Sequence, residues 1–405
     1  MTPAMADSRP PIYQVIGPGL MIVAATYGLA RYSYGLFLPR FASEFDISRD
    51  ILGLIASGSY AGYVAATLFG SWISSLVGPR LPIVLGGGLA TLGILIVATA
   101  GSPWTLSIGI VIAGASPGLS YPPLSDAVMR LVPRDRQNRA YATINAGTSL
   151  GVILAGPLAL WAGGEWRLAW IGFAVFAVMA TFWNLVTMPA GRYGGPRAPL
   201  PQLRWNWFVK PQSYRLLTAA ILLGLVTSVY WTFAVDLIVS TGELAGSPWP
   251  MRWFSLTPDA HPQVFWILIG LSGLVGALAG DLVTVFGVRL AFRTAAMGIA
   301  LAMGALAIAP TNAIILLGSA ILFGSMFILA TGTLGIWSVH VFQDRPSAGF
   351  GATFLLISLG QLVSPAVSGF AAVDHGLAPV FYMTSLLSIS MVFLVPRVNI
   401  RSMAR

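Results

Sequence analysis

Residues 312–341 read NAIILLGSAILFGSMFILATGTLGIWSVHV, a run without aspartate, glutamate, lysine or arginine. About 20 apolar residues are enough to carry a helix across a bilayer, so this run predicts one membrane-spanning helix. Apolar runs of similar length recur along the whole chain. We expect spans at residues 13–38, 51–77, 80–100, 104–131, 139–162, 167–188, 214–238, 262–286, 290–309, 312–341, 348–372 and 376–396. The sequence therefore predicts an all-α membrane protein with twelve transmembrane helices.

The composition of the chain supports a lipid-facing surface. Of its 405 residues, 56% are hydrophobic and only 9% are charged. A soluble protein carries charge on roughly a quarter of its residues, because its surface must be hydrated. The chain also lacks cysteine, which excludes disulfides and thiolate metal sites. Most of the outer surface is therefore expected to contact lipid.

The basic residues are distributed unevenly between the two sides of the predicted bundle. An even number of spans places both termini on one side, and 17 of the 22 Lys and Arg residues fall on that side. Arg40, Arg49, Arg167 and Arg252 fall on the other side, and Arg31 lies within a span. Loops rich in Lys and Arg remain in the cytoplasm. We therefore expect a protein of the inner membrane with both termini in the cytoplasm, and no nucleic-acid partner.

A stretch rich in proline and glycine, residues 189–213, divides the spans into two sets of six. It carries several basic residues and no acidic one. The sequence therefore predicts a six-helix domain over residues 1–188, a basic cytoplasmic linker over 189–213 and a second six-helix domain over 214–405.

The two sets of spans repeat one another at a shift of 209 residues. Residues 78–81 (GPRL) correspond to 287–290 (GVRL), and 149–151 (SLG) correspond to 358–360 (SLG). One common shift at equivalent loops and spans indicates an internal duplication.

Nearer the start of each half the shift falls to 196 residues, which pairs Gly28 with Gly224 and Arg31 with Thr227. The difference of 13 residues predicts an insertion in the outer loop over about 239–262. This segment is either an interfacial aromatic belt or a lid over the outer mouth. Only the first half supplies a cation at the position of Arg31.

Six plus six spans, a basic linker and a duplication resemble the major facilitator superfamily over nearly the whole chain. The loop motif of that superfamily between spans 2 and 3 is Gly-x-x-x-Asp-x-x-Gly followed by basic residues. Residues 71–80 and 280–289 keep its second glycine and an arginine (Arg80 and Arg289), but a hydroxyl side chain replaces the acid. The resemblance implies two pseudo-symmetric six-helix bundles and a transport function.

Two further features bear on gating. Asp126, near the inner end of span 4, is expected to pair with Arg80 or Arg130 as a structural latch. Span 5 carries Gly151-x-x-x-x-Gly156-Pro157, which resembles the glycine-proline motif of antiporters in the superfamily. General helix packing explains these glycines equally well.

Arg31 is the most informative single residue, because it lies deep in the first span. An arginine at such depth costs roughly 2.5–3.5 kcal/mol on insertion scales, so a compensating contact inside the bundle is expected. Tyr27, Arg31 and Tyr34 recur at a spacing that places them on one face of an α-helix. Two interpretations remain open: an anion-binding arginine flanked by tyrosine hydroxyls, or an arginine that snorkels outward or binds backbone carbonyls.

Further polar and aromatic side chains fall on spans that line the central cavity in folds of this kind. The candidate substrate-binding residues are Arg31, Tyr27, Tyr34, Tyr60, Tyr63, Tyr121, Asn145, Tyr230, Trp231, Trp337 and Gln361. The candidate gating or coupling residues are Arg80, Asp126, Asp236, Asp281, Arg289 and His340. No acidic residue lies near the middle of a span, which favours an anionic or neutral substrate over a cationic one.

The chain has no nucleotide-binding Gly-x-x-x-x-Gly-Lys-Ser/Thr run, and its three histidines lack metal-ligand spacing. We therefore expect no enzyme activity, no cofactor and no metal. The predicted function is secondary active transport of a small organic anion by alternating access, in a monomer embedded in the bilayer. The alternative is proton-coupled export of drug-like or metabolic compounds, with protons as the coupling ion. A third hypothesis is a non-transporting receptor on a transporter scaffold.

Overall fold

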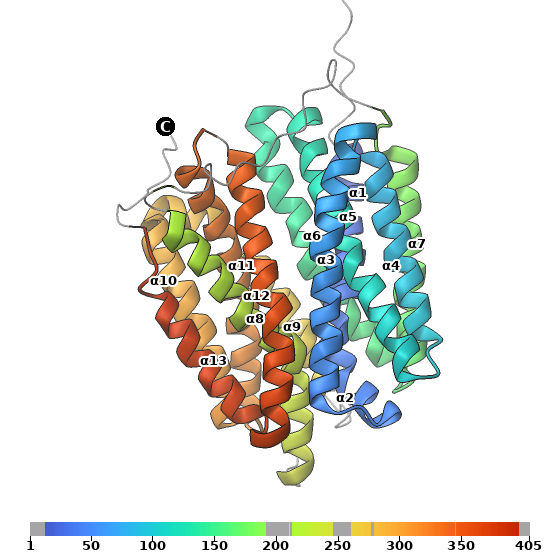
Figure 1. The fold of residues 1–405 in the computed structure, drawn as a ribbon, viewed down its shortest axis with the longest axis vertical. Coiled ribbons are helices and arrows are strands. Elements are labelled where there is room, and N and C mark those ends of the chain that lie inside the picture. The colour runs from blue at the N-terminus through green and yellow to red at the C-terminus, as the bar shows by residue number, and fades with distance from the viewer. Residues whose placement is uncertain are drawn as a thin grey trace, which may run out of the picture.

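The computed structural model describes residues 13–191, 210, 213–245, 261–276, 279–344 and 346–396. Within these ranges every regular element is a helix, and nine helices are long and apolar enough to cross a membrane. Two apolar helices are shorter, and α5 contains three prolines that lower its hydropathy. Figure 1 shows the helices running side by side in two groups. The predicted all-α class is therefore confirmed.

The first span is one continuous rod of 33 residues over Tyr13–Phe45. It consists of α1 (Tyr13–Val23), a π-helical segment η1 (Ala24–Tyr32) and α2 (Ser33–Phe45). π-helical turns are rare and are frequently found at functional sites. Arg31 lies within this segment.

The remaining helices of the first half are α3 (Arg49–Val77), α4 (Arg80–Ala98), α5 (Pro103–Leu131), α6 (Arg134–Trp161) and α7 (Trp166–Thr187). Those of the second half are α8 (Ser213–Ala245), α9 (His261–Gly276), α10 (Ala279–Ile308), α11 (Ala313–Val341), α12 (Pro346–His375) and α13 (Leu377–Met391). Counting the first span once, the described residues form the twelve helices that the sequence predicts.

The internal repeat is visible in the packing. In the first half α4 packs on α5 and α7, and α3 packs on α5; in the second half α10 packs on α11 and α13, and α9 packs on α11. The turn glycines of the repeated motif share one backbone conformation, with φ of 89° at Gly78 and 80° at Gly287. A left-handed φ of this kind favours glycine, because a Cβ would clash with the backbone.

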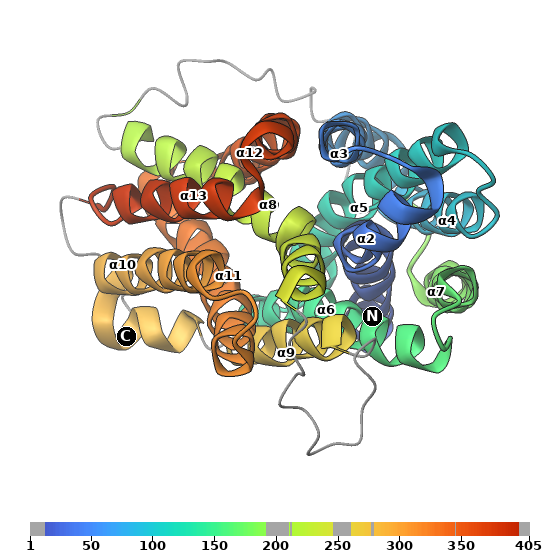
Figure 2. The same ribbon diagram turned by 90° about the horizontal axis from the view of Figure 1, so that it is seen from below.

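The two halves meet mainly through three helix pairs: α3 with α12, α6 with α9, and α2 with α8. Figure 2 shows α3 beside α12 and α6 beside α9, seen from the end at which α2 passes into α3. We call this end the α2–α3 face, and the other end, where α1 begins and α13 ends, the terminal face.

The halves touch backbone to backbone near the α2–α3 face. A Cβ at Gly35 would overlap the carbonyl oxygen of Trp231, one at Gly53 would overlap that of Pro365, and one at Gly369 would overlap that of Arg49. Only glycine allows such close helix approach. The interface is therefore closed on this side of the molecule.

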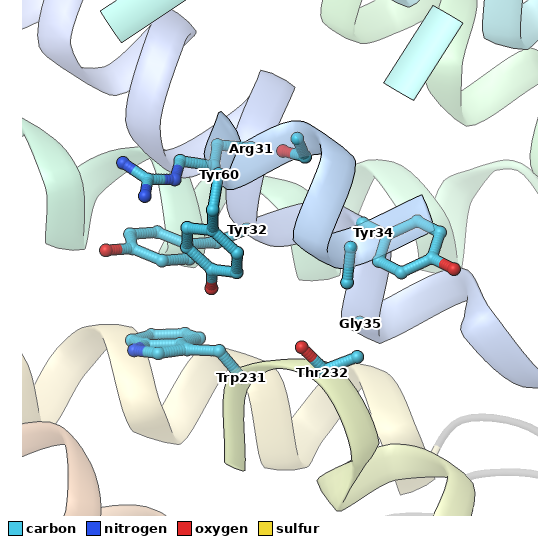
Figure 3. A pocket seen from close by; sticks show the side chains of 9 residues that line it. Arg31, Tyr32, Tyr34, Gly35, Tyr60, Trp231 and Thr232 are labelled. Atoms are coloured by element: carbon cyan, nitrogen blue, oxygen red, sulfur yellow. The ribbon is translucent and has the colours of Figure 1, made fainter. Parts of the chain in front are cut away.

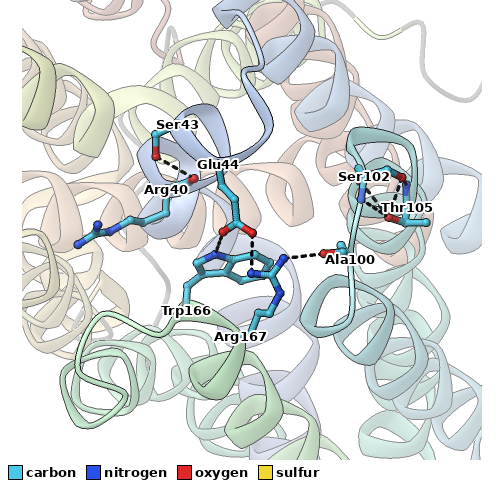
Figure 4. Close-up of polar contacts among 8 residues, drawn as sticks. All are labelled: Arg40, Ser43, Glu44, Ala100, Ser102, Thr105, Trp166 and Arg167. Atoms are coloured by element: carbon cyan, nitrogen blue, oxygen red, sulfur yellow. Dashed lines mark hydrogen bonds and ion pairs between the residues drawn. The ribbon is translucent and has the colours of Figure 1, made fainter.

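Within the first half, a polar cluster fixes the end of the first rod (Figure 4). Arg167 forms an ion pair with Glu44 at 2.6 Å and donates to the carbonyl of Ala100 at 2.7 Å, while the Trp166 indole also donates to Glu44. These contacts hold together the end of α2, the loop after α4 and the start of α7.

Two predicted segments lie largely outside the described residues. They are the linker, for residues 192–209 and 211–212, and the insertion in the loop over 239–262, for residues 246–260.

Candidate substrate-binding site

The π-helical segment directs Arg31 into the centre of the molecule, where the residue is only 5% exposed. Its guanidinium carbon lies 4.1 Å from the ring centre of Tyr63 and 4.5 Å from that of Tyr60. Tyr27 and Tyr32 follow at 5.6 and 5.8 Å. Four aromatic rings therefore surround this cation at distances typical of cation–π contacts.

The polar contacts of Arg31 are incomplete. One terminal nitrogen donates to the Gln361 side-chain oxygen at 3.0 Å, and this bond joins η1 to α12 of the other half. The Nε atom is buried and has no partner. In the part of the chain that the structure describes, no carboxylate pairs with Arg31. The site thus holds a buried cation with a free donor and no counter-charge.

A chain of polar aromatic contacts continues from Arg31 toward the terminal face. The hydroxyls of Tyr27 and Tyr63 lie 2.9 Å apart, and the rings of Tyr27 and Tyr121 meet edge to face at 5.6 Å. Tyr121 donates to the Asn145 side-chain oxygen at 3.4 Å. Tyr27, Tyr121 and Asn145 are partly exposed, whereas Arg31 and Tyr63 are buried. This cluster therefore links the buried Arg31 to partly exposed side chains.

A small pocket, with a cavity volume of about 10 Å³ and room for about one water molecule, lies between the halves beside Arg31 (Figure 3). Its lining residues are Arg31, Tyr32, Tyr34, Gly35, Ala56, Ser59, Tyr60, Trp231 and Thr232. Trp231 of α8 stacks on Tyr32 of η1, with ring centres 4.3 Å apart. Trp231 also borders a second pocket, with a cavity volume of about 10 Å³, between α6, α9 and α11.

One predicted site residue reaches the pocket only with its ring, and two others lie away from the pocket. The Tyr34 ring borders the pocket, but its hydroxyl donates to the carbonyl of Leu52. Figure 3 shows this ring turned away from the guanidinium, because the π-helical turn breaks the spacing on which a shared face depends. Tyr230 and Trp337 are fully buried inside the second half, where Tyr230 bonds Ser319 and Trp337 packs on Phe292.

Tyr32, Ser59 and Thr232 line the pocket although the sequence did not single them out. Tyr32 adjoins Arg31, so an α-helical spacing assigns it to another face. The many tyrosines around Arg31 in the sequence are the signal that could have indicated Tyr32.

The predicted gating arginines bind backbone. Arg80 donates to the carbonyl of Leu185, and Arg289 donates to that of Pro396 at 3.0 and 3.2 Å. Asp126 pairs with Arg130 at 2.8 Å, one of the two partners expected for it.

The other coupling candidates differ in environment. Asp281 is exposed near the start of α10, and His340 lies 2.9 Å from the Ile336 carbonyl of its own helix. Asp236 of α8 forms an ion pair across the halves with Arg49 of α3, at 2.8 Å. Of these candidates, Asp236 is the one whose described ion pair joins the two halves.

Two helical bundles that enclose a polar site between them define a class of protein: a multi-pass membrane transporter. Among the described residues no group of three or more His, Asp or Glu side chains could hold a metal ion. The Major Facilitator Superfamily profile matches residues 20–365, and the chain belongs to that family. Its members are membrane transporters and not enzymes.

Curated relatives cover most of the chain. The purine ribonucleoside efflux pump NepI of Escherichia coli is 23% identical over 369 residues, which is 90% of this chain and 89% of that protein. OpdE of Pseudomonas aeruginosa, described as a transcription regulatory protein, is 26% identical over 351 residues, or 84% and 82%.

Solved structures share the fold. A mutant of the nucleoside transporter NupG has a TM-score of 0.75 at 13% identity, covering 94% of this chain and 98% of that one. A POT family transporter in complex with 5-aminolevulinic acid has a TM-score of 0.76 at 13% identity, covering 95% and 94%. At this level of identity the likeness shows the fold alone.

Proposed function

We propose that this transporter moves a small organic anion through the site around Arg31 by secondary active transport. One observation carries the proposal: a buried guanidinium with an unpaired Nε and, among the residues that the structure describes, no carboxylate partner. A cation left in this state is costly inside a membrane protein. A substrate carboxylate would supply both the missing charge and the acceptor, since guanidinium matches carboxylate in geometry.

The mechanism follows from where the halves touch. The bond from Arg31 to Gln361, the ion pair from Arg49 to Asp236 and the bond from the Ala366 amide to Ser57 all join the two halves. The last two lie near the α2–α3 face, where the glycine contacts also lie. Opening this face requires that these contacts separate, whereas residues 1–188 and 214–405 each move as one body joined by the linker 189–213.

We further propose that the terminal face is cytoplasmic, that the protein resides in the inner membrane and that it works as a monomer. The excess of basic residues on the terminal side supports this orientation. The form described here is then closed to the outside, and the Arg49–Asp236 pair is its outer latch. Gating by Asp126, Asp281, Arg80 and Arg289 would act from the inner side.

A second candidate is proton-coupled efflux of a neutral purine nucleoside. NepI carries that substrate in its name and matches 90% of this chain. The guanidinium of Arg31 suits this ligand too, because arginine donates to the adjacent O6 and N7 acceptors of 6-oxopurines. Asp236, which loses Arg49 when the halves part, is the candidate coupling residue for this function.

Flux in proteoliposomes tests both candidates. Proteoliposomes that contain the purified protein would be loaded with one of a panel of organic acids or with inosine. Efflux of each compound would be measured with and without a pH gradient. We expect the carboxylates to leave the vesicles and inosine to remain inside them. Transport of inosine alone, driven by an inward proton gradient, would reject the anion proposal in favour of the second candidate.

A further inference from the structure

The pocket presents two unpaired hydrogen-bond donors from opposite halves of the protein. One is Nε of Arg31, on η1. The other is the indole nitrogen of Trp231, on α8, whose residue is only 4% exposed. Figure 3 shows the guanidinium and the indole nitrogen toward the same end of the pocket, with the rings of Tyr32 and Tyr60 between them. A buried donor without an acceptor is unfavourable, so both groups point to a ligand with two acceptors.

The distances limit the size of such a ligand. The guanidinium carbon of Arg31 lies 5.8 Å from the Tyr32 ring centre, which lies 4.3 Å from that of Trp231. The guanidinium and the indole are therefore no more than about 10 Å apart, the sum of these two distances. A single ring with an acceptor at each end is long enough to reach both groups. In the closed form the ring of Tyr32 lies between them, so such a ligand reaches both donors only when the halves part and this ring moves.

The lining indicates the shape of the ligand. Rings and small side chains border the pocket, and no leucine, isoleucine, valine or methionine is among its lining residues. Phe327 adds an edge-to-face contact to Trp231 at 5.5 Å, and Tyr32 is already stacked on the indole. Aromatic faces of this kind favour a flat ring in offset or edge-to-face contact.

We infer that the substrate is a planar, single-ring aromatic carboxylate with a second acceptor opposite the carboxylate. The carboxylate pairs with Arg31, the ring packs among Tyr32, Tyr60 and Trp231, and the second acceptor receives the Trp231 indole N–H. Such a ligand bonds both halves at once and so couples their movement. This inference rests on the proposed transport of organic anions and specifies the class of anion.

Calorimetric binding to the purified full-length protein tests it with three matched probes. They are 4-hydroxybenzoate, which is planar and anionic; trans-4-hydroxycyclohexanecarboxylate, which has the same groups on a puckered ring; and 4-hydroxybenzamide, which is planar and neutral. We expect 4-hydroxybenzoate to bind about tenfold more tightly than the puckered acid and at least about tenfold more tightly than the amide.

Each other outcome has a separate meaning. Equal binding of the two acids overturns the planar-ring inference and leaves the organic-anion proposal standing. Equal binding of the acid and the amide overturns the anion proposal itself. Binding of none of the three overturns the inference.

The second acceptor is tested by Trp231→Phe, which keeps a ring and removes the N–H. We expect 4-hydroxybenzoate affinity to fall about fivefold, whereas benzoate, which lacks the second acceptor, loses nothing beyond the change in ring. Trp266→Phe is the matched control, because Trp266 also has an unpaired buried indole nitrogen but does not line the pocket. An equal loss in both variants, or equal losses for both ligands, would contradict the assignment of Trp231.

Discussion

The first rod (13–45) and α8 (213–245) occupy equivalent places in the two halves, and both contain 33 residues. They share their packing. Gly28 approaches the backbone of Gly151 on α6, and its counterpart Gly224 approaches that of Gly360 on α12. They differ at the site, where Arg31 has no counter-charge and its counterpart Thr227 donates to the Leu223 carbonyl of its own helix. The duplication therefore preserves how helices pack, whereas the substrate recognition that we propose lies where the halves differ.

Removing the cation tests the difference between the two halves most strongly. Arg31→Ala should weaken binding of the best carboxylate substrate by about 100-fold, since a charged hydrogen bond and its ion pair are lost together. The matched control is Thr227→Val, which removes a hydroxyl bonded within its own helix and should leave affinity within about twofold. Calorimetry on the purified variants measures both. A similar loss in the two variants would mean that the halves contribute alike.

The shared packing can be tested in the same symmetric manner. Gly28→Val and Gly224→Val should each lower the free energy of unfolding by about 1–3 kcal/mol, because each side chain meets backbone of a neighbouring helix. Thermal unfolding in detergent measures the two losses. Gly318→Ala is the control, since a Cβ there meets no atom within 4 Å. A loss confined to one half would show that the packing is not shared.

The outer latch should have a smaller effect. Asp236→Asn removes the ion pair with Arg49 and should raise labelling of a cysteine placed at Ser59, in the pocket, by roughly fivefold from the predicted outer side. The chain has no cysteine, so the background is clean. Glu44→Gln breaks a pair within the first half alone and should leave labelling unchanged. Labelling that rises equally in both variants would contradict a role for Asp236 in closing the halves.

The smallest effect is expected at the cluster of Tyr27, Tyr121 and Asn145. Tyr121→Phe removes the hydroxyl that donates to Asn145 and should weaken substrate binding by about twofold, because a single neutral hydrogen bond is lost. Binding of the same carboxylate measures this change. A loss as large as that of Arg31→Ala would place the substrate at Tyr121 and not at Arg31.

The helices and the repeat could be predicted from the sequence, because hydrophobic length and turn glycines depend on local residues. The matching φ of Gly78 and Gly287 shows how directly the repeated motif encodes one turn. The pairing of Asp126 could be narrowed to two arginines, but the choice of Arg130 depends on tertiary geometry.

The neighbours of Arg31 could be predicted only in part. The spacing of Tyr27, Arg31 and Tyr34 assumes a regular α-helix, and the π-helical segment places Tyr32 at the pocket and directs the Tyr34 hydroxyl to Leu52. Hydropathy cannot separate Trp231, which lines the pocket, from Trp337, which packs in the core, because both are tryptophans on apolar helices. That difference depends on helix rotation, which the packing of the whole bundle decides.

The most direct test of the central claim is a binding cycle between the charge of Arg31 and the charge of the ligand. Affinities of a carboxylate and of its neutral amide would be measured for the unaltered protein and for Arg31→Gln. The account predicts a preference for the carboxylate of at least about tenfold in the unaltered protein and its disappearance in the variant. A preference for the carboxylate that persists in Arg31→Gln would contradict the account, because the ligand charge would then be recognised elsewhere.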